Sequence, residues 1–579
     1  MPEDEEVPRN PQVIIPIVVV WSLFLGVAWY WRHMNTVSFA VLVLVSLPFV
    51  AIAYLAASYA GEGSKLYGLR CITDRLPAVK RPEGHVHFRT KMMWTILILI
   101  LYYVLTNVFI YGLDKKTTID VFESYRAILA GAQGSLMHLG IGPIVTGSII
   151  MQLFTGAKIF NLDLSKEDDK ATYQGVQKLL VLIMILVEAI PQVYGYLQPS
   201  ATFVQNMNNV WAGHGDGLAK SIIVAQLFVG SYLVFLMDEV VSKWGIGSGI
   251  SLFIAAGVSR AIFTGSLNWM PVNTDAPLSI RNPPAGTIPK TIYIVTHSSA
   301  SSLANGGIET ILLRPPNPLI ALIGTTIIFL VVAYAESARV ELPLAHESAR
   351  GARGRYPIRL IYASNIPVIL MSALLANISM FSLLFWSHPT MSKFPLLGHN
   401  WMLGAYEPGS SQPVAGLAWY LNRPRGLYEW LLPMISQAYR DAYLHGHDIG
   451  QLVVKLVVYV TIMTVGSILF AKFWIETTNM GPRDVAKQIQ NSGMRIPGFR
   501  RDPRVLEKVL QRYIPVVTVI SGAFVGLLAA GANLIGTVGQ TSGTGVLLTV
   551  GILIRLYEQI GKEQAMEMHP ILRSFFGAE

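Results

Sequence analysis

The chain contains many long apolar runs, and these limit what it can fold into more than any other feature of its sequence. A helix of roughly 20 apolar residues crosses the ~30 Å hydrocarbon core of a bilayer. Hydrophobic residues make up 52% of the 579 residues and charged residues only 14%, whereas charged residues make up about 25% of soluble globular chains. The sequence therefore predicts an all-α polytopic membrane protein.

Twelve membrane spans are expected along the chain. Two of them, at 13–31 and 37–58, form a transmembrane hairpin within an N-terminal extension, residues 1–62. A polar and basic stretch, residues 63–91, follows as a cytoplasmic amphipathic linker. The other ten spans are expected at 92–113, 120–156, 175–197, 217–238, 247–265, 317–338, 358–386, 448–475, 513–536 and 542–560.

The segment 120–156 does not have the pattern of a plain span. It begins with a glycine-interrupted piece, VFESYRAILAGAQGSLMHL, and continues as an apolar stretch that is too short to cross a bilayer alone. In lipid, backbone outside a helix is tolerated only where protein or a water-filled cavity satisfies its hydrogen bonds. The pattern therefore indicates a broken helix beside a transport pathway, with an ordinary kinked span as the alternative.

Lys and Arg residues are unevenly distributed among the links between the spans of this chain, whose net charge is +9. The links at 339–359 and 476–512 are rich in them, whereas the long links at 266–316 and 387–447 are poor in them. Because positively charged loops stay in the cytoplasm, we expect the first pair of links to be cytoplasmic and the second pair to be external. The number of spans then places both the N-terminus and the C-terminus in the cytoplasm.

The sequence has no pattern for binding a nucleotide, a cofactor or a metal. A GxxxxGK motif followed by Ser or Thr is absent, and the GIGSG run lacks the spacing and context of a dinucleotide loop. His85 with His87, and His445 with His447, lie in separate predicted loops, where solvated histidines are the favoured interpretation. The only cysteine, Cys71, cannot form an intramolecular disulfide. We therefore expect no cofactor, no metal site and no catalytic residue.

Ionisable residues inside membrane spans are candidates for function, and Glu188 is the clearest of them here. Asp238, Glu239, Glu336 and Glu341 lie at predicted cytoplasmic ends of helices, where solvated end charges are the favoured interpretation. An ion-coupled secondary transporter with inverted repeats would need several carboxylates near the bilayer midplane. Such a transporter is the alternative function at this point.

Six strings of the sequence resemble the large pore-forming subunit of the Sec protein translocase, the SecY or Sec61-α type in its archaeal form. The resemblance covers about 65–579 with the strings in order and consistently spaced. The strings are LGIGPIVTGSIIMQL at 139–153, LMDEVVSKWGIGSGISLFIAAGVS at 236–259, YAESARVELPLAH at 334–346, YPIRLIYASNIPVIL at 356–370, FWIETTNM at 473–480 and GTGVLLTVGILIRLYEQI at 543–560.

The resemblance implies a ten-helix bundle in two pseudo-symmetric inverted halves, 92–265 and 317–579, joined by the external loop 266–316. It also implies that residues 122–138 form a plug that closes a resting channel. The implied function is that of the central subunit of a protein-conducting channel in the cell membrane, not that of an enzyme. Such a channel translocates secretory polypeptides across the membrane and inserts membrane proteins into it.

The same resemblance implies three sets of functional residues. A ring of branched apolar side chains would seal the pore, a polar cluster would form a lateral gate, and cytoplasmic arginines would contact the ribosome. The ring comprises Ile141, Val145, Ile250, Ile254, Ile369 and Leu548. The gate cluster comprises Thr146, Glu188 and Asn377, and the arginines are Arg353, Arg355, Arg359, Arg500 and Arg501.

The partners that the resemblance implies are a SecE or Sec61-γ type subunit, a Sec-β type subunit, the ribosome through its RNA, signal sequences and nascent polypeptides, the signal recognition particle receptor, and membrane lipid. In the family, an arginine near the end of the plug pairs with a glutamate that corresponds to Glu476. This chain has Ala132 and Gln133 at that place, and Arg126 stands at a different spacing. The resemblance therefore does not predict this ion pair here.

Overall fold

The computed structural model describes most of the chain from residue 65 to residue 568. The residues outside the description are 1–64, 85, 115–125, 127, 157–161, 163, 165, 196, 274–275, 281, 347–352, 360, 362–364, 388–391, 393–398, 408–409, 445, 479, 492–493, 496–502 and 569–579. The predicted hairpin at 1–62 lies outside the described residues, as do the C-terminus and part of the predicted plug.

Within the described residues, nine helices are long and apolar enough to cross a membrane, and they lie where the sequence predicts spans. They are α4 (Phe88–Asn107), α6 (Glu167–Gly195), α8 (Gly215–Trp244), α9 (Gly249–Leu267), α13 (Leu319–Ser337), α14 (Ile366–Ser387), α18 (Ile449–Thr477), α20 (Pro503–Ile535) and α21 (Gly543–Met568). The tenth expected span is the shorter helix α5, Gly142–Gly156, of 15 residues. At 1.5 Å per residue this helix is only about 22 Å long, so it is too short to cross alone, as the sequence predicts.

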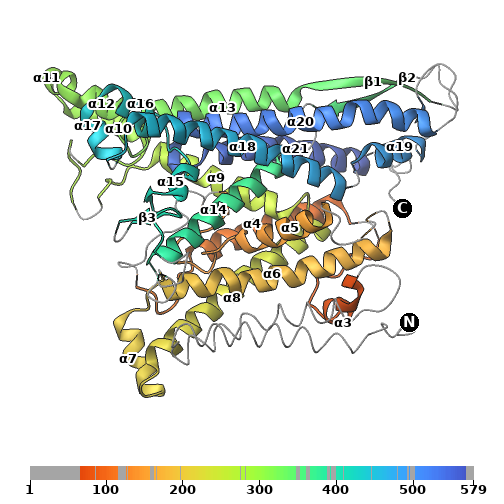
Figure 1. Cartoon of the computed structure of the whole chain (residues 1–579), viewed down its shortest axis with the longest axis horizontal. Coiled ribbons are helices and arrows are strands. Elements are labelled where there is room, and N and C mark those ends of the chain that lie inside the picture. Colours follow the sequence, from red (N-terminus) through yellow and green to blue (C-terminus); the bar gives the residue numbers. More distant parts are fainter. Residues whose placement is uncertain are drawn as a thin grey trace.

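The helices form two groups that lie against each other (Figure 1). In the first group α5 contacts α6, and α8 contacts both α6 and α4; in the second group α18 contacts α20 and α14, and α13 contacts α21. Contacts of α9 with α21, and of α5 with α14 and α18, join the two groups. We refer to these two groups of helices as the two halves of the molecule. That one half is an inverted copy of the other stays a prediction.

Helices α18 and α20 pack closely because α20 presents two glycines to α18. A Cβ atom added to Gly522 would lie 2.8 Å from Ile468 Cα, and one added to Gly526 would lie 2.8 Å from the Met463 carbonyl oxygen. Both distances are too short for real Cβ atoms. The two residues form a GxxxG pattern, which lets membrane helices approach each other through their backbones.

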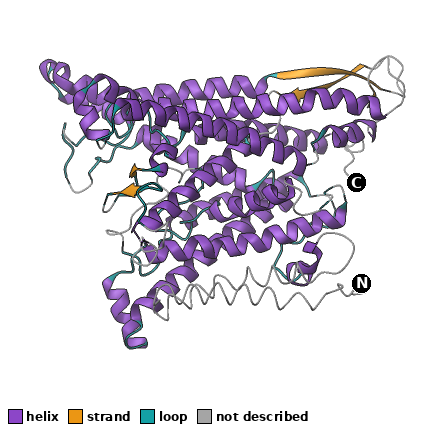
Figure 2. Ribbon diagram, in the orientation of Figure 1, coloured by secondary structure: helices purple, strands orange, loops and turns teal. Residues whose placement is uncertain are grey.

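Both links that are rich in Lys and Arg contain strands, which the expectation of an all-α chain did not include. Strand β1 (Arg339–His346) pairs antiparallel with β2 (Arg353–Arg359) and with β5 (Met494–Arg495), which gives the strand order β2-β1-β5. Figure 2 shows β1 and β2 extending from the end of the helical bundle. The link at 476–512 also contains helix α19, Pro482–Asn491.

The predicted span at 358–386 starts too early. Residues 358 and 359 belong to β2, and helix α14 begins only at Ile366. Pro367 explains this boundary, because proline is tolerated in the first turn of a helix and would cost a hydrogen bond in its interior. The predicted start at 358 would place Pro367 well inside the helix, whereas it lies in the first turn of α14.

The opposite end of the molecule carries short helices within the long links that are poor in Lys and Arg (Figure 1). The first link contains α10 (Thr287–His297), α11 (Ala300–Ser302), the π-helix η3 (Leu303–Gly307) and α12 (Ile308–Leu312). The second link contains β3 (Ala405–Tyr406), β4 (Pro413–Ala415), α15 (Leu417–Leu421), α16 (Leu427–Ile435) and α17 (Gln437–Tyr443). Four further short helices lie among the described residues: η2 (Lys65–Leu69), α3 (Arg70–Thr73), α7 (Ala201–Val210) and η5 (Val538–Gln540).

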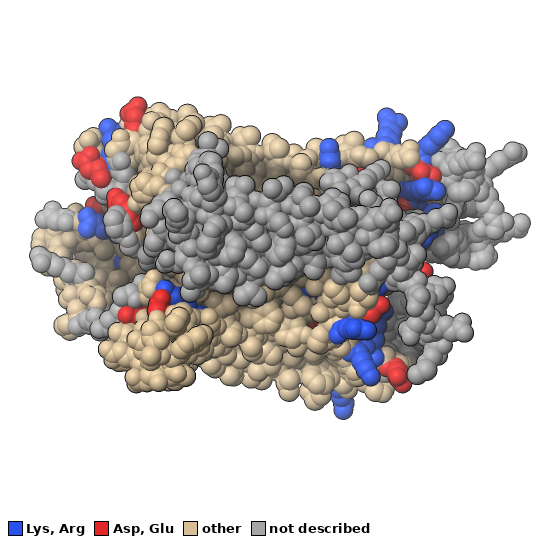
Figure 3. Space-filling model, turned by 60° about the horizontal axis from the view of Figure 1, so that its bottom comes forward, with Lys and Arg blue, Asp and Glu red and all other residues tan. Residues whose placement is uncertain are grey.

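Charged side chains gather at the two ends of the molecule and leave its middle apolar. In Figure 3 most of the visible Lys and Arg side chains lie at the end that carries α19 and the three-stranded sheet. The band between the ends contains few charged residues among those that are described. This distribution is the one expected of a bundle that crosses a bilayer along its helices.

Candidate functional site

A single apolar cluster lies where the two halves meet. Five of the six predicted ring residues are buried in it: Ile141, Val145, Ile254, Ile369 and Leu548. The sixth, Ile250, is half-buried and packs against the same cluster. The ring residues come from the turn before α5 and from α5, α9, α14 and α21, so helices of both halves contribute to the cluster.

The described part of the predicted plug also packs into this cluster. Ile128, Leu129 and Met137 are buried there, in a stretch of turns that precedes α5. The Tyr102 hydroxyl donates to the Ala130 carbonyl oxygen at 3.0 Å, and the Ile141 N–H donates to the Leu129 carbonyl oxygen at 2.8 Å. As predicted, the polypeptide leaves helical geometry here, and protein contacts satisfy its backbone.

Arg126 does not take the place of the family's plug arginine. Its guanidinium donates to the His138 carbonyl oxygen at 2.8 Å, within the plug segment itself. Glu476 is exposed and lies near the end of α18 that adjoins α19. His138 is itself held by side chains, because its imidazole accepts from the Gly134 N–H at 3.0 Å and bonds Gln192 Oε1 at 3.0 Å.

The three predicted gate residues lie in direct contact across the two halves. Asn377 Nδ2 on α14 donates to Thr146 Oγ1 on α5 at 2.9 Å. The Thr146 hydroxyl lies 2.9 Å from Glu188 Oε1 on α6 and 2.9 Å from the Gly142 carbonyl oxygen, and it can donate its proton to either. Glu188 is only 1% exposed, whereas Thr146 and Asn377 are half-buried, so the cluster is a partly buried polar contact between apolar helices.

Three carboxylates that the sequence places at helix ends have specific partners in the structure. Glu239 is buried and accepts from Lys178 Nζ at 2.5 Å and from the Val79 N–H at 2.8 Å. The Ile250 N–H donates to Asp238 Oδ1 at 2.8 Å. The interpretation of Asp238 and Glu239 as solvated end charges is therefore wrong.

Glu336 is also buried, which corrects the same interpretation for a third residue. It accepts from Asn365 Nδ2 at 3.2 Å and lies 3.7 Å from a guanidinium nitrogen of Arg555. These residues join α13, α14 and α21, and sequence reasoning did not find this network. For Glu341 the structure gives only the backbone, in β1.

Three of the predicted ribosome-contacting arginines fall on the three-stranded sheet. The backbone of Arg353, Arg355 and Arg359 forms strand β2. Arg500 and Arg501 lie outside the described residues. In the part of the chain that the structure describes, no group of three or more His, Cys, Asp or Glu side chains could hold a metal ion.

The fold and the site define a class of protein: a multi-pass helical membrane protein whose two halves meet in one buried apolar cluster. Comparison with known proteins identifies the family. The SecY family model matches residues 135–557, and the model of the plug domain of Sec61p matches residues 100–134, which include most of the predicted plug. The chain belongs to the SecY family.

Two similar proteins each match most of this chain. The protein translocase subunit SecY of Archaeoglobus fulgidus is 44% identical over 519 residues, which are 89% of this chain and 99% of that protein. The SecY subunit of Haloferax volcanii is 45% identical over 517 residues, 88% of this chain and 98% of that protein.

Solved structures give the same result. A structure described as that of a protein-conducting channel has 38% identity and a TM-score of 0.66, and it covers 86% of this chain and 98% of its own. Sec61 in the canine ribosome-channel complex from the endoplasmic reticulum has 37% identity and a TM-score of 0.64, with 86% and 98% of the chains covered. Family membership makes the chain a protein translocase subunit and sets aside the alternative of an ion-coupled transporter.

Proposed function

We propose that the chain is the central subunit of a channel that conducts polypeptides through the apolar cluster between its two halves. It moves secretory polypeptides across the cell membrane and inserts membrane proteins sideways into the lipid. The observation that carries this proposal is the burial of Ile141, Val145, Ile254, Ile369 and Leu548 in one cluster to which both halves contribute.

A ring of branched apolar side chains suits this task for a physical reason. An apolar constriction excludes water and ions when it is empty. The same side chains form no specific hydrogen bonds that a passing chain would have to break, so they yield around peptides of any sequence. No step of this function needs a reactive group, and we propose that the subunit has no enzymatic activity and draws its energy from the translating ribosome.

Crosslinking of a stalled nascent chain to the ring tests this proposal. A cysteine replaces Ile250 in a background that carries Cys71→Ser, and the nascent chain carries a single cysteine inside a translocating segment. We expect an adduct from Ile250→Cys and none from the control Ile323→Cys, because Ile323 is 50% exposed on α13, away from the cluster. Equal adducts at both positions would reject a polypeptide path through the apolar cluster. The absence of an adduct at Ile250 with every secretory substrate would reject it as well.

We propose further that signal sequences and membrane segments leave the channel between α5 and α14. The support is the hydrogen-bonded cluster of Thr146, Glu188 and Asn377 at this seam. A polar contact across two apolar helices acts as a latch, because opening the seam breaks its hydrogen bonds.

The ribosome is the proposed partner at the end of the molecule that carries the three-stranded sheet. Arginine binds phosphate through its forked N–H donors, and contacts with RNA phosphates weaken steeply with salt. Reversing the charges of Arg359 and Arg500 together should weaken ribosome binding in a salt-dependent way and leave membrane insertion of the subunit intact. Reversal of Arg483 and Lys508 changes the net charge equally and is the matched control; equal losses from both pairs would refute the assignment.

The remaining partners follow from family membership. We propose that the channel works with a SecE or Sec61-γ type subunit and a Sec-β type subunit, in membrane lipid. We also propose that the signal recognition particle and its receptor deliver the translating ribosome to it. We propose that the three-stranded sheet and both termini face the cytoplasm and that the end with α10 and α16 faces outward. This orientation agrees with the distribution of Lys and Arg.

A further inference from the structure

A relay of three buried side chains leads from the plug segment to the second half of the molecule. His138 is the last residue of the predicted plug, Gln192 lies on α6 and Met380 lies on α14. Their side chains belong to residues that are 3%, 0% and 0% exposed. His138 Nε2 lies 3.0 Å from Gln192 Oε1, and Gln192 Nε2 donates to Met380 Sδ at 3.7 Å. The relay therefore links three segments that are far apart in the sequence.

The backbone next to His138 sets the direction of the hydrogen bonds in the relay. His138 Nδ1 accepts from the Gly134 N–H at 3.0 Å, so a neutral imidazole carries its proton on Nε2. Nε2 then donates to Gln192 Oε1, and this bond turns the amide nitrogen of Gln192 towards the Met380 thioether. Each bond of the relay thus orients the group that makes the next bond.

The relay lies directly beside the gate cluster. Gln192 is four residues after Glu188 on α6, and Met380 is three residues after Asn377 on α14. Residues at these spacings share one face of a helix. Helix α14 contacts α6 as well as α5, so opening of the seam at the gate cluster would also separate Gln192 from Met380.

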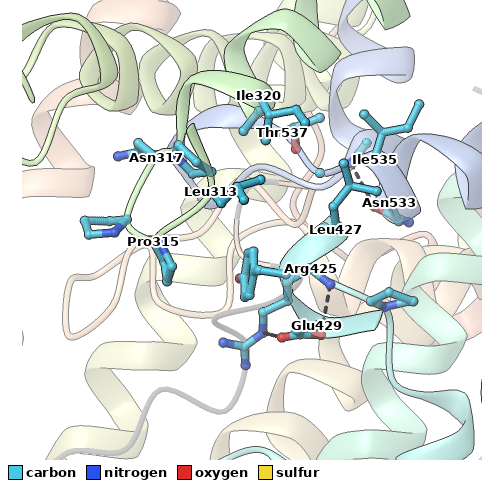
Figure 4. A pocket seen from close by; sticks show the side chains of 18 of the residues that line it. Leu313, Pro315, Asn317, Ile320, Arg425, Leu427, Glu429, Asn533, Ile535 and Thr537 are labelled. Carbon is cyan, nitrogen blue, oxygen red and sulfur yellow. Dashed lines mark hydrogen bonds and ion pairs between the residues drawn. The ribbon is translucent and has the colours of Figure 1, made fainter. Parts of the chain in front are cut away.

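The contact between Arg425 and Glu429 differs from the relay because it is local in the sequence. Arg425 Nε lies 3.5 Å from Glu429 Oε1, beside a cavity of about 240 Å³ (Figure 4). The lining of this cavity comes from the residues before α13, the residues that lead into α16 and the turn between α20 and α21, and it includes no residue of the relay. A contact of this kind does not pass a movement of the seam to the plug.

Loss of the contact with Met380 would weaken the bond that Gln192 makes to the plug segment. When α14 moves away, the amide N–H of Gln192 loses an acceptor in an apolar surrounding, which is unfavourable. The amide then turns towards another acceptor, and its carbonyl oxygen turns away from His138. Buried hydrogen bonds that share a group depend on one another in this way.

We propose that His138, Gln192 and Met380 couple the position of the plug to the state of the seam. While the seam is closed, Met380 holds the Gln192 amide in the orientation that binds His138, and the plug stays in place. When an apolar segment opens the seam, the bond to His138 is lost and the plug is released. All three are positioning residues, and this inference rests on the proposed exit of segments between α5 and α14.

Thiol labelling of the plug in proteoliposomes that contain the full chain tests this coupling. The chain carries Cys71→Ser and Ala132→Cys, because Ala132 lies half-buried in the plug segment. A membrane-impermeant maleimide is applied on both sides of the membrane, with and without a synthetic peptide that has a poly-leucine core and a photo-crosslinking group. We expect the peptide to raise the labelling rate about tenfold, in line with the cost of one unpaired buried N–H group.

Substitutions in this background separate the hydrogen bond from packing. Met380→Leu should abolish the response to the peptide, because leucine has a similar volume but accepts no hydrogen bond. Met371→Leu is the matched control and should keep the response, because Met371 is also buried on α14 but packs against Gly466 of α18. Met380→Gln supplies an amide oxygen in place of the sulfur and should keep the response as well.

Gln192→Leu removes both side-chain bonds of the relay. It should raise the labelling rate without peptide about tenfold, and the peptide should add little to this rate. Unchanged labelling of Gln192→Leu at rest, or a normal response in Met380→Leu, would overturn the coupling. Loss of the response in Met371→Leu would overturn it too, because packing along α14 would then be the cause.

The crosslinking group separates failure of the coupling from failure of the proposed exit. Without relay substitutions, we expect adducts of the peptide with α14 together with the faster labelling. A peptide that crosslinks to α14 and leaves the labelling rate unchanged would overturn the coupling while the proposed exit stands. The absence of any crosslink to α14 would reject the exit itself, and the coupling with it.

Discussion

Asn377 Nδ2 donates to Thr146 Oγ1 at 2.9 Å, and this bond joins α14 of one half of the molecule to α5 of the other. The Thr146 hydroxyl also lies within hydrogen-bond distance of the buried Glu188 carboxyl. Hydrogen bonds between membrane helices contribute about 0.6 kcal/mol on average and at most about 1.7 kcal/mol. This contact is thus strong enough to bias the seam between closed and open, and weak enough to yield to an apolar segment.

Replacing Asn377 by Leu should lower the hydrophobicity that a segment needs for membrane insertion. The substitution removes the bond to Thr146, which makes opening of the seam easier by about 1 kcal/mol. Insertion efficiency of a graded series of test segments measures the threshold. Ser382→Ala, also on α14 but bonded to the Leu403 carbonyl oxygen, is the control and should leave the threshold unchanged. An unaltered threshold in Asn377→Leu would show that the contact does not regulate the seam.

The length of the apolar runs was enough to predict the helices that cross the membrane. Whether a segment crosses a bilayer depends on its own length and hydrophobicity, and not on contacts with distant parts of the chain. The start of α14 was missed because hydropathy does not separate an apolar strand end from the helix that follows it. The position of Pro367 was the signal that could have corrected it.

The burial of Glu239 and Glu336 could not be predicted, because their partners lie far away in the sequence. Glu239 pairs with Lys178, and Glu336 contacts Asn365 and Arg555. The periodicity of hydrophobic residues predicts on which face of a helix a residue lies, but it does not predict which other helix packs against that face. The gate contact was likewise found only through the family motifs, since no local pattern relates Thr146, Glu188 and Asn377.

Glu239 is predicted to stabilise the first half of the molecule. Its carboxylate ties α8 to Lys178 on α6 and to the Val79 N–H in the linker. Glu239→Ala leaves the Lys178 ammonium without this buried counter-charge and should lower the free energy of unfolding by about 3 kcal/mol.

The matched control for Glu239→Ala is Asp216→Ala. Asp216 pairs with Lys220 at 2.7 Å on the same helix, but its side chain is 60% exposed, so its loss should change stability by about 0.5 kcal/mol or less. Equilibrium unfolding in mixed micelles measures both variants. Similar losses in the two variants would mean that burial does not strengthen the Glu239 contacts.

Lys290 on α10 should make the stability of this end of the molecule depend on pH. Burial, and next the nearby Arg314 cation, lower the pKa of the Lys290 ammonium from 10.5 to about 8. Its Nζ donates to the carbonyl oxygens of Arg314 and Pro316 at 2.8 Å and 3.2 Å. The folded protein therefore holds this proton less tightly than the unfolded chain, so stability should rise as the pH increases from about 8 to 10.5 and stay level beyond.

The size of this rise is at most on the order of 3 kcal/mol. The thermal midpoint of the wild-type chain and of Lys290→Met, recorded across the same pH range, measures it. The difference between the two curves should climb with pH, because Lys290→Met removes the titrating ammonium. A parallel course for Lys290→Met and the wild type would exclude Lys290 as the titrating group.

Gly551 is predicted to be needed both for stability and for the seal of the channel. A Cβ atom at this position would collide with Asn365 Nδ2 and would lie 2.6 Å from Glu336 Oε1. Gly551→Ala should therefore push α21 away from α13 and α14 and lower stability by about 1–3 kcal/mol. Leu548 lies one turn before Gly551, and the Ile369 N–H donates to the Asn365 carbonyl oxygen at 3.4 Å, so the displacement should reach two residues of the ring.

Unfolding in mixed micelles and ion leakage from proteoliposomes test this prediction together. Gly561→Ala is the control on the same helix, because nothing lies within 4 Å of an added Cβ there. An exposed helical glycine replaced by alanine should stabilise the protein by about 1 kcal/mol without any leak. Gly551→Ala should be less stable and should leak ions, because a widened apolar ring admits water. If Gly551→Ala lowers stability but the channel does not leak ions, the contacts of Glu336 stabilise the second half of the molecule and do not affect the ring.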